Sequence, residues 1–307
     1  MSETGERTME IGVVDLGRVG AQIVRRLLAG GHRSVVWDRS PRVVAELAAE
    51  KAHGASSLAD LAFELEPPRT VVIAGASGTV DEVIAELLPR LSADDIIVNC
   101  ADSHHMEDAR RAVQLKTLGI WSVDVGISGG VAYPEQGRCL TIGGEPTAVK
   151  RLEPLFRQLA QDAEFLHCGP AGAGHFVNMM HHGVERSLIA IYSEAFSVLR
   201  AAELGGARLD LAAIAEAWLH GSLVASPLLE LTARALKTDA GVRDAAAPNR
   251  LMHDQWSAMR AAAEEDVPVP VLASALYSAE TRGDFSNRLL AAVQRERTNP
   301  RQPAGSA

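Results

Sequence analysis

The sequence predicts an α/β protein, with a doubly wound parallel sheet followed by an all-helical second domain. Short apolar runs alternate with amphipathic stretches through the first half of the 307 residues, which is typical of such a sheet. From about residue 172 to residue 296, only helical periodicity remains. The length also favours two cores, because one domain takes about 150 residues. We therefore expect domains at residues 1–170 and 171–307.

Five apolar runs are expected to form the first strands, with helices between them. They are EIGVVDL, SVVWDR, TVVIAGA, DIIVNCA and IWSVDVG, and residues 79–90 are typical of the intervening helices. A further strand, helix and strand are predicted from RCLTIGGEPTAVKRLEPLFRQLA and AEFLHCG, which complete the sheet. After CGPAGAGH, glycines and prolines such as Gly205, Gly206 and Pro268 divide the chain into helices.

Composition and charge exclude several classes of partner. The 30 basic and 39 acidic residues give a net charge of -9, and no basic block could follow a phosphate backbone. We expect no nucleic-acid partner. The first ten residues lack the apolar core of a signal peptide, and no run of about 18 apolar residues occurs, so we expect a cytoplasmic protein without a membrane partner. The widely spaced Cys100, Cys139 and Cys168 are expected to be buried thiols.

A glycine turn in IGVVDLGRVGAQIVRRLLAGG predicts a dinucleotide site, because it lies between a strand and a helix. Gly17 and Gly20 occupy the second and third glycine positions of the fingerprint, where they allow approach of the pyrophosphate and close packing of the helix. Asp15 stands at the first position, which weakens the fingerprint because it adds a Cβ to the tight turn and a carboxylate near the anion. The cofactor is expected to be NAD or NADP, or to be absent.

Four polar residues are expected to join the glycines at the cofactor, three of them in or near the turn and the fourth, Asp102, further along the chain. Asp38 closes the second strand, where an acidic side chain accepts hydrogen bonds from the adenosine ribose and favours NAD. Arg39 follows it and could contact a 2'-phosphate, so the choice between NAD and NADP stays open. Arg18, between the two glycines, completes the predicted set. The alternative is a Rossmann-like fold that binds no dinucleotide.

A polar stripe marks the helix predicted from GHFVNMMHHGVERSLIAIYSEAF. Its members are Asn178, His181, His182, Glu185 and Arg186. Spacings of three, four, seven and eight residues place them within one broad face of a helix, because a turn takes about 3.6 residues. The five side chains therefore converge on one region.

These segments make the chain similar to a known family. It resembles the short bacterial 6-phosphogluconate dehydrogenases of the β-hydroxyacid dehydrogenase superfamily, from about residue 9 to residue 295. The matching segments include VDVGISGGV, CLTIGGEPTAVKRLEPLF, GPAGAGHFVNMMHHGVE and FSNRLLAAV. The resemblance implies a Rossmann-like dinucleotide-binding domain, a helical domain for substrate and dimerisation, and a homodimer. It also implies that Ser128, Gly129 and Gly130 bind the substrate near the nicotinamide.

The reaction that the resemblance implies is oxidation of a sugar-acid hydroxyl by hydride transfer, then loss of carbon dioxide and protonation of an enediol. A lysine is the base of that reaction and a glutamate the later acid. The segment NMMHHGVER places Asn178 at the lysine position, whereas Glu185 keeps the glutamate position. An amide cannot act as a general base near neutral pH. No lysine occurs between residues 151 and 236 to replace it.

Three further departures concern the substrate. The segment NCADS puts Asp102 where the family has an asparagine at substrate and nicotinamide. MHDQWS, aligned with a shift of one residue, puts neutral Gln255 at the phosphate-binding cation and Ser257 at a threonine. The ending QRERTNP also differs from that of the family. Because the bidentate phosphate contact is lost, we predict that the protein does not process 6-phosphogluconate.

Several side chains could supply new chemistry. His175, His181 and His182 can each exchange a proton near pH 7, so any of them could take the role of the lysine. Glu185 could remain the acid, and Arg186 is a fixed cation suited to a carboxylate or phosphate. We expect no metal, because the chain has no H-E-x-x-H signature. The site is expected in a cleft between the two domains, where the stripe would meet Ser128, Gly129 and Gly130. The opposing interpretation is that the polar face is only an inherited wall of this cleft, whose groups bind only water and each other.

Three classes of function follow. The first is an NAD(P)-dependent oxidoreductase for another small molecule, either a hydroxy acid or an imine, with catalytic Glu185, His181, His182 and Asn178. The second is a non-redox enzyme that uses the same cleft for proton transfer, cyclisation, elimination or decarboxylation, which Asp15 and Asp102 favour. The third is a catalytically silent homologue that binds a ligand.

Overall fold

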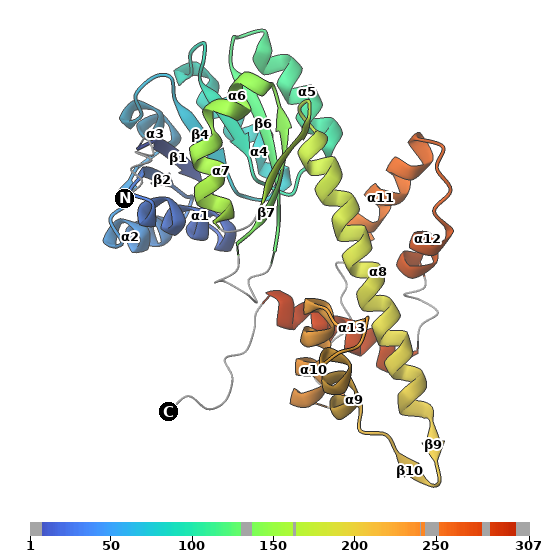
Figure 1. Cartoon of the computed structure of the whole chain (residues 1–307). Coiled ribbons are helices and arrows are strands. Elements are labelled where there is room, and N and C mark those ends of the chain that lie inside the picture. The colour runs from blue at the N-terminus through green and yellow to red at the C-terminus, as the bar shows by residue number, and fades with distance from the viewer. Residues whose placement is uncertain are drawn as a thin grey trace, which may run out of the picture. The chain divides into compact units, whose positions relative to one another are not determined.

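The computed structural model describes residues 8–129, 137–161, 164–239, 241–242, 252–277 and 283–298. These residues form two compact units (Figure 1). Along α8 the chain passes from the first unit to the second between Asn178 and Met179. Within the described residues, no helix combines the length and the apolar character needed to cross a membrane.

The first unit is built on an eight-stranded sheet in the order β3-β2-β1-β4-β5-β6-β7-β8. The strands are β1 (Glu10–Val14), β2 (Arg33–Trp37), β3 (His53–Gly54), β4 (Thr70–Ile73), β5 (Ile96–Asn99), β6 (Trp121–Ser128), β7 (Cys139–Gly144) and β8 (Phe165–Gly169). All pairs are parallel except β6 with β7. The predicted α/β fold is confirmed, with the antiparallel β7 as a difference. Residues 129–138 are too few for a parallel crossover, which takes a dozen or more.

Helices cover both faces of this sheet. They are α1 (Arg18–Ala29), α2 (Pro41–Ala49), α3 (Leu58–Glu64), α4 (Val80–Leu87), α5 (His105–Lys116), α6 (Pro146–Arg151) and α7 (Glu153–Ala160), with 3-10 turns at Ser77–Thr79 and Leu88–Arg90. Successive strand residues face opposite sides: Val13 packs with Leu27 and Phe156, whereas Val14 packs with Leu61 and the α4 side chains. Burial on both faces explains why the strands appear as continuous apolar runs.

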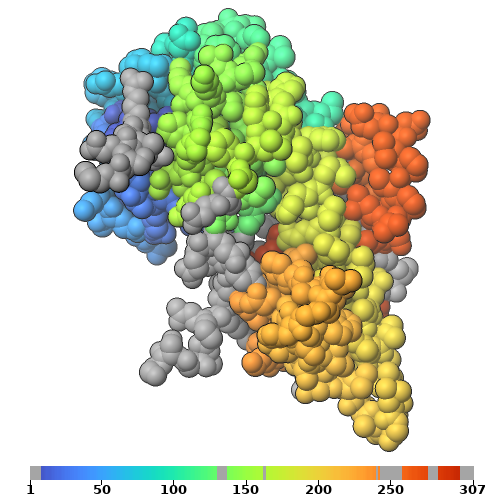
Figure 2. Space-filling view, in the orientation of Figure 1, coloured from blue at the N-terminus to red at the C-terminus, as the bar shows by residue number. Residues whose placement is uncertain are grey.

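The second unit is helical. Its helices are α8 (Ala173–Ala201), which begins in the first unit, α9 (Leu211–Leu219), α10 (Pro227–Thr238), α11 (Met252–Glu264), α12 (Pro270–Tyr277) and α13 (Asp284–Thr298). Ile189 and Phe196 of α8 share a core with Leu229, Leu236 and Leu289. The space-filling view shows α9 and α10 packed against each other (Figure 2).

A two-stranded hairpin interrupts this helical unit. Strands β9 (Glu203–Leu204) and β10 (Ala207–Arg208) pair antiparallel across Gly205 and Gly206. The φ angles of the two glycines are 62° and 79°, as a tight hairpin turn requires. From the sequence, these glycines are predicted only to separate two helices. The hairpin is thus an addition to the predicted helical domain.

Candidate functional site

The glycine turn follows β1 and begins at Asp15. Asp15 has a φ of 64°, a left-handed conformation that costs little for glycine and more for a residue with a Cβ. A Cβ on Gly20 would lie 2.3 Å from the Asp15 carbonyl oxygen, so this glycine lets α1 approach the strand. A Cβ on Gly17 would meet no atom within 4 Å. The backbone at Gly17 therefore faces open space, as a pyrophosphate site requires.

The Asp15 carboxylate lies against the loop after β4. Its Oδ2 accepts a hydrogen bond from Thr79 Oγ1 at 3.3 Å. A Cβ on Gly75 would lie 2.0 Å from the same Oδ2, so only glycine leaves room there. Burial is the main cause that raises the pKa of Asp15, and Asp38 adds to it, while Thr79 acts in the opposite sense. Asp15 is evident from the sequence, whereas Gly75 and Thr79, which accommodate its side chain, are not.

Asp38 and Arg39 already have protein partners. Asp38 Oδ2 accepts a hydrogen bond from the Leu16 N–H at 2.7 Å, and Oδ1 accepts one from the Ser40 N–H at 2.7 Å. Asp38 thus connects the glycine turn to the end of β2. Arg39 Nη2 donates to Glu82 Oε2 at 2.8 Å in an exposed ion pair. A 2'-phosphate would have to compete with Glu82 for Arg39.

A second group of predicted residues lies where β6 ends and α8 begins. Ser128 Oγ donates a hydrogen bond to Asn178 Oδ1 at 2.7 Å, and both side chains are buried. A Cβ on Gly126 would lie 2.4 Å from Asn178 Cβ, so this glycine allows α8 to approach β6. Gly129 has a φ of 106°, which favours glycine. Gly130 lies outside the described residues.

A buried carboxylate, Asp108, fixes the turn that carries Asp102, and it is not among the residues predicted from the sequence. Asp108 Oδ1 accepts a hydrogen bond from Asn99 Nδ2 at 2.6 Å, and Asn99 Nδ2 also donates to Ser103 Oγ at 2.9 Å. Asp108 Oδ2 lies 2.6 Å from His175 Nδ1 in the first turns of α8. Asp108 therefore connects the Asp102 turn to the helix that carries the stripe.

His175 is held by two carboxylates. Burial alone would lower its pKa, but the contact with Asp108 and the charge of Asp124 outweigh burial and raise it. Asp124 accepts hydrogen bonds from the N–H groups of Gly172 and His175, at 2.6 and 2.8 Å. The side chains of Asp108, Asp124 and His175 are close enough to share a metal ion. Because N–H groups already bind their carboxylate oxygens, this cluster supports no metal site.

The second unit holds the other members of the stripe around Glu185. Arg297 Nη1 of α13 donates to Glu185 Oε1 at 2.8 Å, and His182 Nδ1 lies 3.6 Å from Oε2. Burial would raise the pKa of Glu185, but His182 and Arg297 outweigh it and lower the pKa to about 2. Glu185 is therefore ionised at neutral pH. No local sequence signal could reveal Arg297, which lies 112 residues away.

His181 and Arg186 flank this ion pair on α8. Burial is the main cause that lowers the pKa of His181, with His182 and Arg297 acting in the same sense and Glu185 opposing them. His181 is thus neutral at pH 7 and can accept a proton. Arg186 is half-buried. His181, His182 and Glu185 are close enough to share a metal ion, but Arg297 competes for the carboxylate.

The structure groups the predicted residues by unit. Gly17, Gly20, Arg18, Asp38, Arg39, Asp102, Ser128, Gly129 and Asn178 belong to the first unit, and His181, His182, Glu185 and Arg186 to the second. A shared site between the two groups stays a prediction. The side chains of Gln255 and Ser257 in α11 lie outside the described residues.

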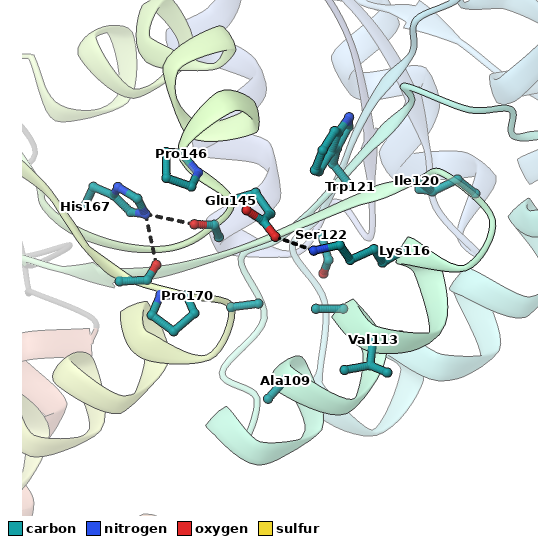
Figure 3. Close-up of a pocket in the computed structure, with 14 residues that line it drawn as sticks. Ala109, Val113, Lys116, Ile120, Trp121, Ser122, Glu145, Pro146, His167 and Pro170 are labelled. Carbon is teal, nitrogen blue, oxygen red and sulfur yellow. Dashed lines mark hydrogen bonds and ion pairs between the residues drawn. The ribbon is translucent and has the colours of Figure 1, made fainter.

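An apolar hollow of about 660 Å³ lies at the other end of β6 (Figure 3). It is lined by α5, the turn between β7 and α6, and the end of β8, and Lys116 bridges to Glu145 across its wall. Trp121 in its lining begins β6, whereas Ser128 ends it, so the two ends are roughly 23 Å apart at about 3.3 Å per residue. None of the predicted site residues lines this hollow.

Comparisons with known proteins place both parts of the chain in one family. Residues 10–170 match the NAD binding domain of 6-phosphogluconate dehydrogenase, and residues 174–302 match the C-terminal domain of that enzyme. A Haloferax volcanii protein named as an NAD(+)-dependent, decarboxylating 6-phosphogluconate dehydrogenase is 36% identical, over 92% of this chain and 94% of its own length. The Bacillus subtilis protein YqeC, whose name assigns it provisionally to the same enzymes, is 34% identical, over 94% of this chain and 97% of its own.

A solved structure shows the same fold at lower identity. The 3-hydroxyisobutyrate dehydrogenase of Mycobacterium tuberculosis, solved with L-serine, has a TM-score of 0.72 and 17% identity. The match covers 95% of this chain and 100% of that one.

Proposed function

The chain belongs to the 6-phosphogluconate dehydrogenase family of NAD(P)-dependent oxidoreductases, and on that premise we propose that it oxidises a hydroxy acid other than 6-phosphogluconate. One observation carries the proposal. At the family's lysine position, Asn178 accepts the hydrogen bond of the buried Ser128 hydroxyl. An amide oxygen accepts a hydrogen bond but does not take up the proton. The base of the family reaction is therefore absent where that reaction needs it.

We assign the base to the neutral His181. A base must be unprotonated at working pH, and the lowered pKa of His181 meets this condition. Ionised Glu185 holds the Arg297 guanidinium in place at 2.8 Å, and His182 lies beside its other oxygen. To act as the later acid, Glu185 must first lose the contact with Arg297 and gain a proton. Arg186 is assigned to the substrate carboxylate, because a guanidinium binds a carboxylate through two hydrogen bonds.

The cofactor proposal is NAD or NADP on the turn at Gly17 and Gly20. The open space at Gly17 supports it, and the carboxylate of Asp15 opposes it. Asp38 favours NAD through its position after β2. Its two bonds to backbone N–H groups leave further acceptor capacity on each oxygen for a ribose hydroxyl.

The homodimer is also a proposal, supported by an apolar stripe on α8. Val184, Leu188, Ile191 and Val198 are all exposed. Their spacings of four, three and seven residues place them along one seam of the helix, as in helices that pair. A second copy of the chain would cover this seam.

The non-redox enzyme is the second candidate, and the Asp15 carboxylate is the observation that favours it. Calorimetry of NADH and NADPH against the purified protein separates the two. Micromolar binding of either nucleotide supports the oxidoreductase, whereas no binding up to millimolar concentration defeats it. A panel of hydroxy acids, and imines in the reverse direction, then follows absorbance at 340 nm, with 6-phosphogluconate as the reference. Binding without turnover of any panel member would point to the silent homologue.

A further inference from the structure

Arg138 is a buried cation without a carboxylate partner among the described residues. It lies directly before β7 and is 9% exposed. Its guanidinium donates a hydrogen bond to Gln22 Oε1, which is a neutral amide. The guanidinium stays charged at every physiological pH. A buried charge normally pairs with an opposite charge, and the described residues bring no carboxylate to this guanidinium.

Further cations surround the contact between Arg138 and Gln22. Gln22 lies on α1, four residues after Arg18 and four before Arg26, so the three side chains share one face of the helix. Arg26 donates to the Leu159 carbonyl oxygen, and the Arg138 N–H donates to the Ala160 carbonyl oxygen at 3.1 Å. Both arginines therefore meet the last turn of α7. The carbonyl groups there offset part of the positive charge, because a helix ends with a partial negative charge.

The electrostatics of Arg138 agree with this geometry. Burial is the main cause that lowers its pKa, and the charges of Arg26 and Arg18 lower it further. Each cause reports an unfavourable environment for a cation. A bound anion would relieve all of them together.

The cluster lies at the edge of the sheet that binds ligands in folds of this kind. Ser128, the last residue of β6, pairs with Cys139, which follows Arg138 directly. Arg138 therefore lies beside the carboxyl end of β6. The carboxyl end of β1, where α1 begins, lies at the same edge because β1, β4, β5 and β6 are parallel. Ligands of open α/β sheets bind along this edge.

We propose that Arg138 and Gln22, with Arg18 and Arg26 around them, form a binding site for a phosphate group. The planar guanidinium offers two parallel N–H groups to phosphate oxygens, and the Gln22 amide can turn its N–H₂ group toward the same anion. The site lies in the first unit, whereas Gln255, where a phosphate contact is predicted to be lost, belongs to the second. The phosphate belongs either to the dinucleotide or to a second small molecule.

The test is calorimetric titration of inorganic phosphate into the full-length protein, with sodium chloride adjusted to constant ionic strength. The wild type should bind phosphate saturably at millimolar concentration. Arg138→Gln removes the guanidinium and should weaken binding about tenfold or more, as expected for loss of a bidentate contact. Arg25→Gln is the matched control, because Arg25 lies on the same helix but pairs with Glu50 at 2.7 Å. It should bind phosphate as the wild type does.

Two further arms complete the experiment. Arg138→Lys keeps the charge and loses the forked geometry, so it should bind with intermediate affinity, and it replaces Arg138→Gln if circular dichroism shows that variant to be unfolded. Repeating the titration with saturating NADH identifies the source: competition assigns the phosphate to the dinucleotide, and simultaneous binding assigns it to another molecule. Absence of saturable binding by the wild type, or equal affinity of the wild type and the Arg138 variant, would overturn the proposal. Phosphate binding does not depend on turnover, so either result is independent of the proposed oxidoreductase activity.

Discussion

Replacing Asp15 should restore affinity for the dinucleotide, and two variants separate the causes. Asp15→Asn keeps the size of the side chain and removes its charge. A carboxylate close to a hydrated phosphate costs on the order of 1 kcal/mol, so this variant should bind NADH about fivefold more tightly. Asp15→Gly also relieves the left-handed backbone at a φ of 64°, which should add about 1 kcal/mol to the free energy of unfolding.

The affinities are measured by calorimetry and the unfolding free energies by urea titration. The effect on affinity should depend on pH, because the pKa of Asp15 is raised. Lowering the pH protonates the wild-type carboxyl, so the difference between wild type and Asp15→Asn should be largest at pH 8 and smallest at the acid end. Equal dissociation constants at pH 8 would show that the carboxylate does not act on the cofactor.

Gly75 provides a check on where the Asp15 side chain lies. A Cβ at position 75 would be 2.0 Å from Asp15 Oδ2, so Gly75→Ala should destabilise the wild type. In the Asp15→Gly background that space is empty, and the same change should cost much less. The coupling energy from the double-mutant cycle should fall in the range of about 0.5 to 3 kcal/mol. Strictly additive changes would refute the packing of Asp15 against Gly75.

Four other outcomes follow from the site. Glu185→Gln should lower kcat about 100 to 10,000-fold on any substrate found. Arg297→Gln keeps the carboxylate and should lower kcat far less. Equal losses of kcat in the two variants would argue against proton chemistry at Glu185. Glu185 has a lowered pKa of about 2, so its contribution to stability, about 3 kcal/mol, is present above its unfolded pKa near 4.5 and lost as pH falls toward 2. Urea unfolding of wild type and Glu185→Gln should therefore differ most above pH 5 and converge only as the pH falls to about 2. Oxidation of 6-phosphogluconate should be negligible with either nucleotide, and Asn178→Lys alone should not restore it. Turnover by the wild type at the level usual for the family, in a steady-state assay, would contradict this prediction. Ile191→Asp should convert a dimer to a monomer in light scattering, and an unchanged mass would exclude the α8 seam as the interface.

Local patterns predicted the first unit well, because its sheet is buried on both faces. After their first residues, the strands around Val13 and Val72 carry no polar side chain, which identifies them as strands without any knowledge of their partners. The glycine turn was likewise visible, since Gly17 and Gly20 act within one short segment. The direction of β7 could not be predicted in this way, because it depends on the length of the connection before the strand and not on the composition of the strand.

The partners of the site residues were hidden by distance along the chain. Thr79 lies 64 residues from Asp15, and Arg297 lies 112 residues from Glu185. Charge and position on a helix predicted that Glu185 belongs to a polar face, but only the fold reveals that an arginine holds it ionised. Asp108 was also overlooked, because a single aspartate on an amphipathic helix resembles any solvated residue until its burial is known.

Gly126 shows how the scaffold and the chemistry at Asn178 can change separately. The atoms of residue 178 that come close to Gly126 are the Cβ and the Cγ, and lysine has both atoms as well. The approach of α8 to β6 therefore does not depend on what residue 178 carries beyond its Cγ. At position 178, a side chain that transfers a proton can therefore be replaced by one that does not, without moving α8. Gly126 fixes the position of the helix but takes no part in the reaction, so the reaction can change without a change in the scaffold.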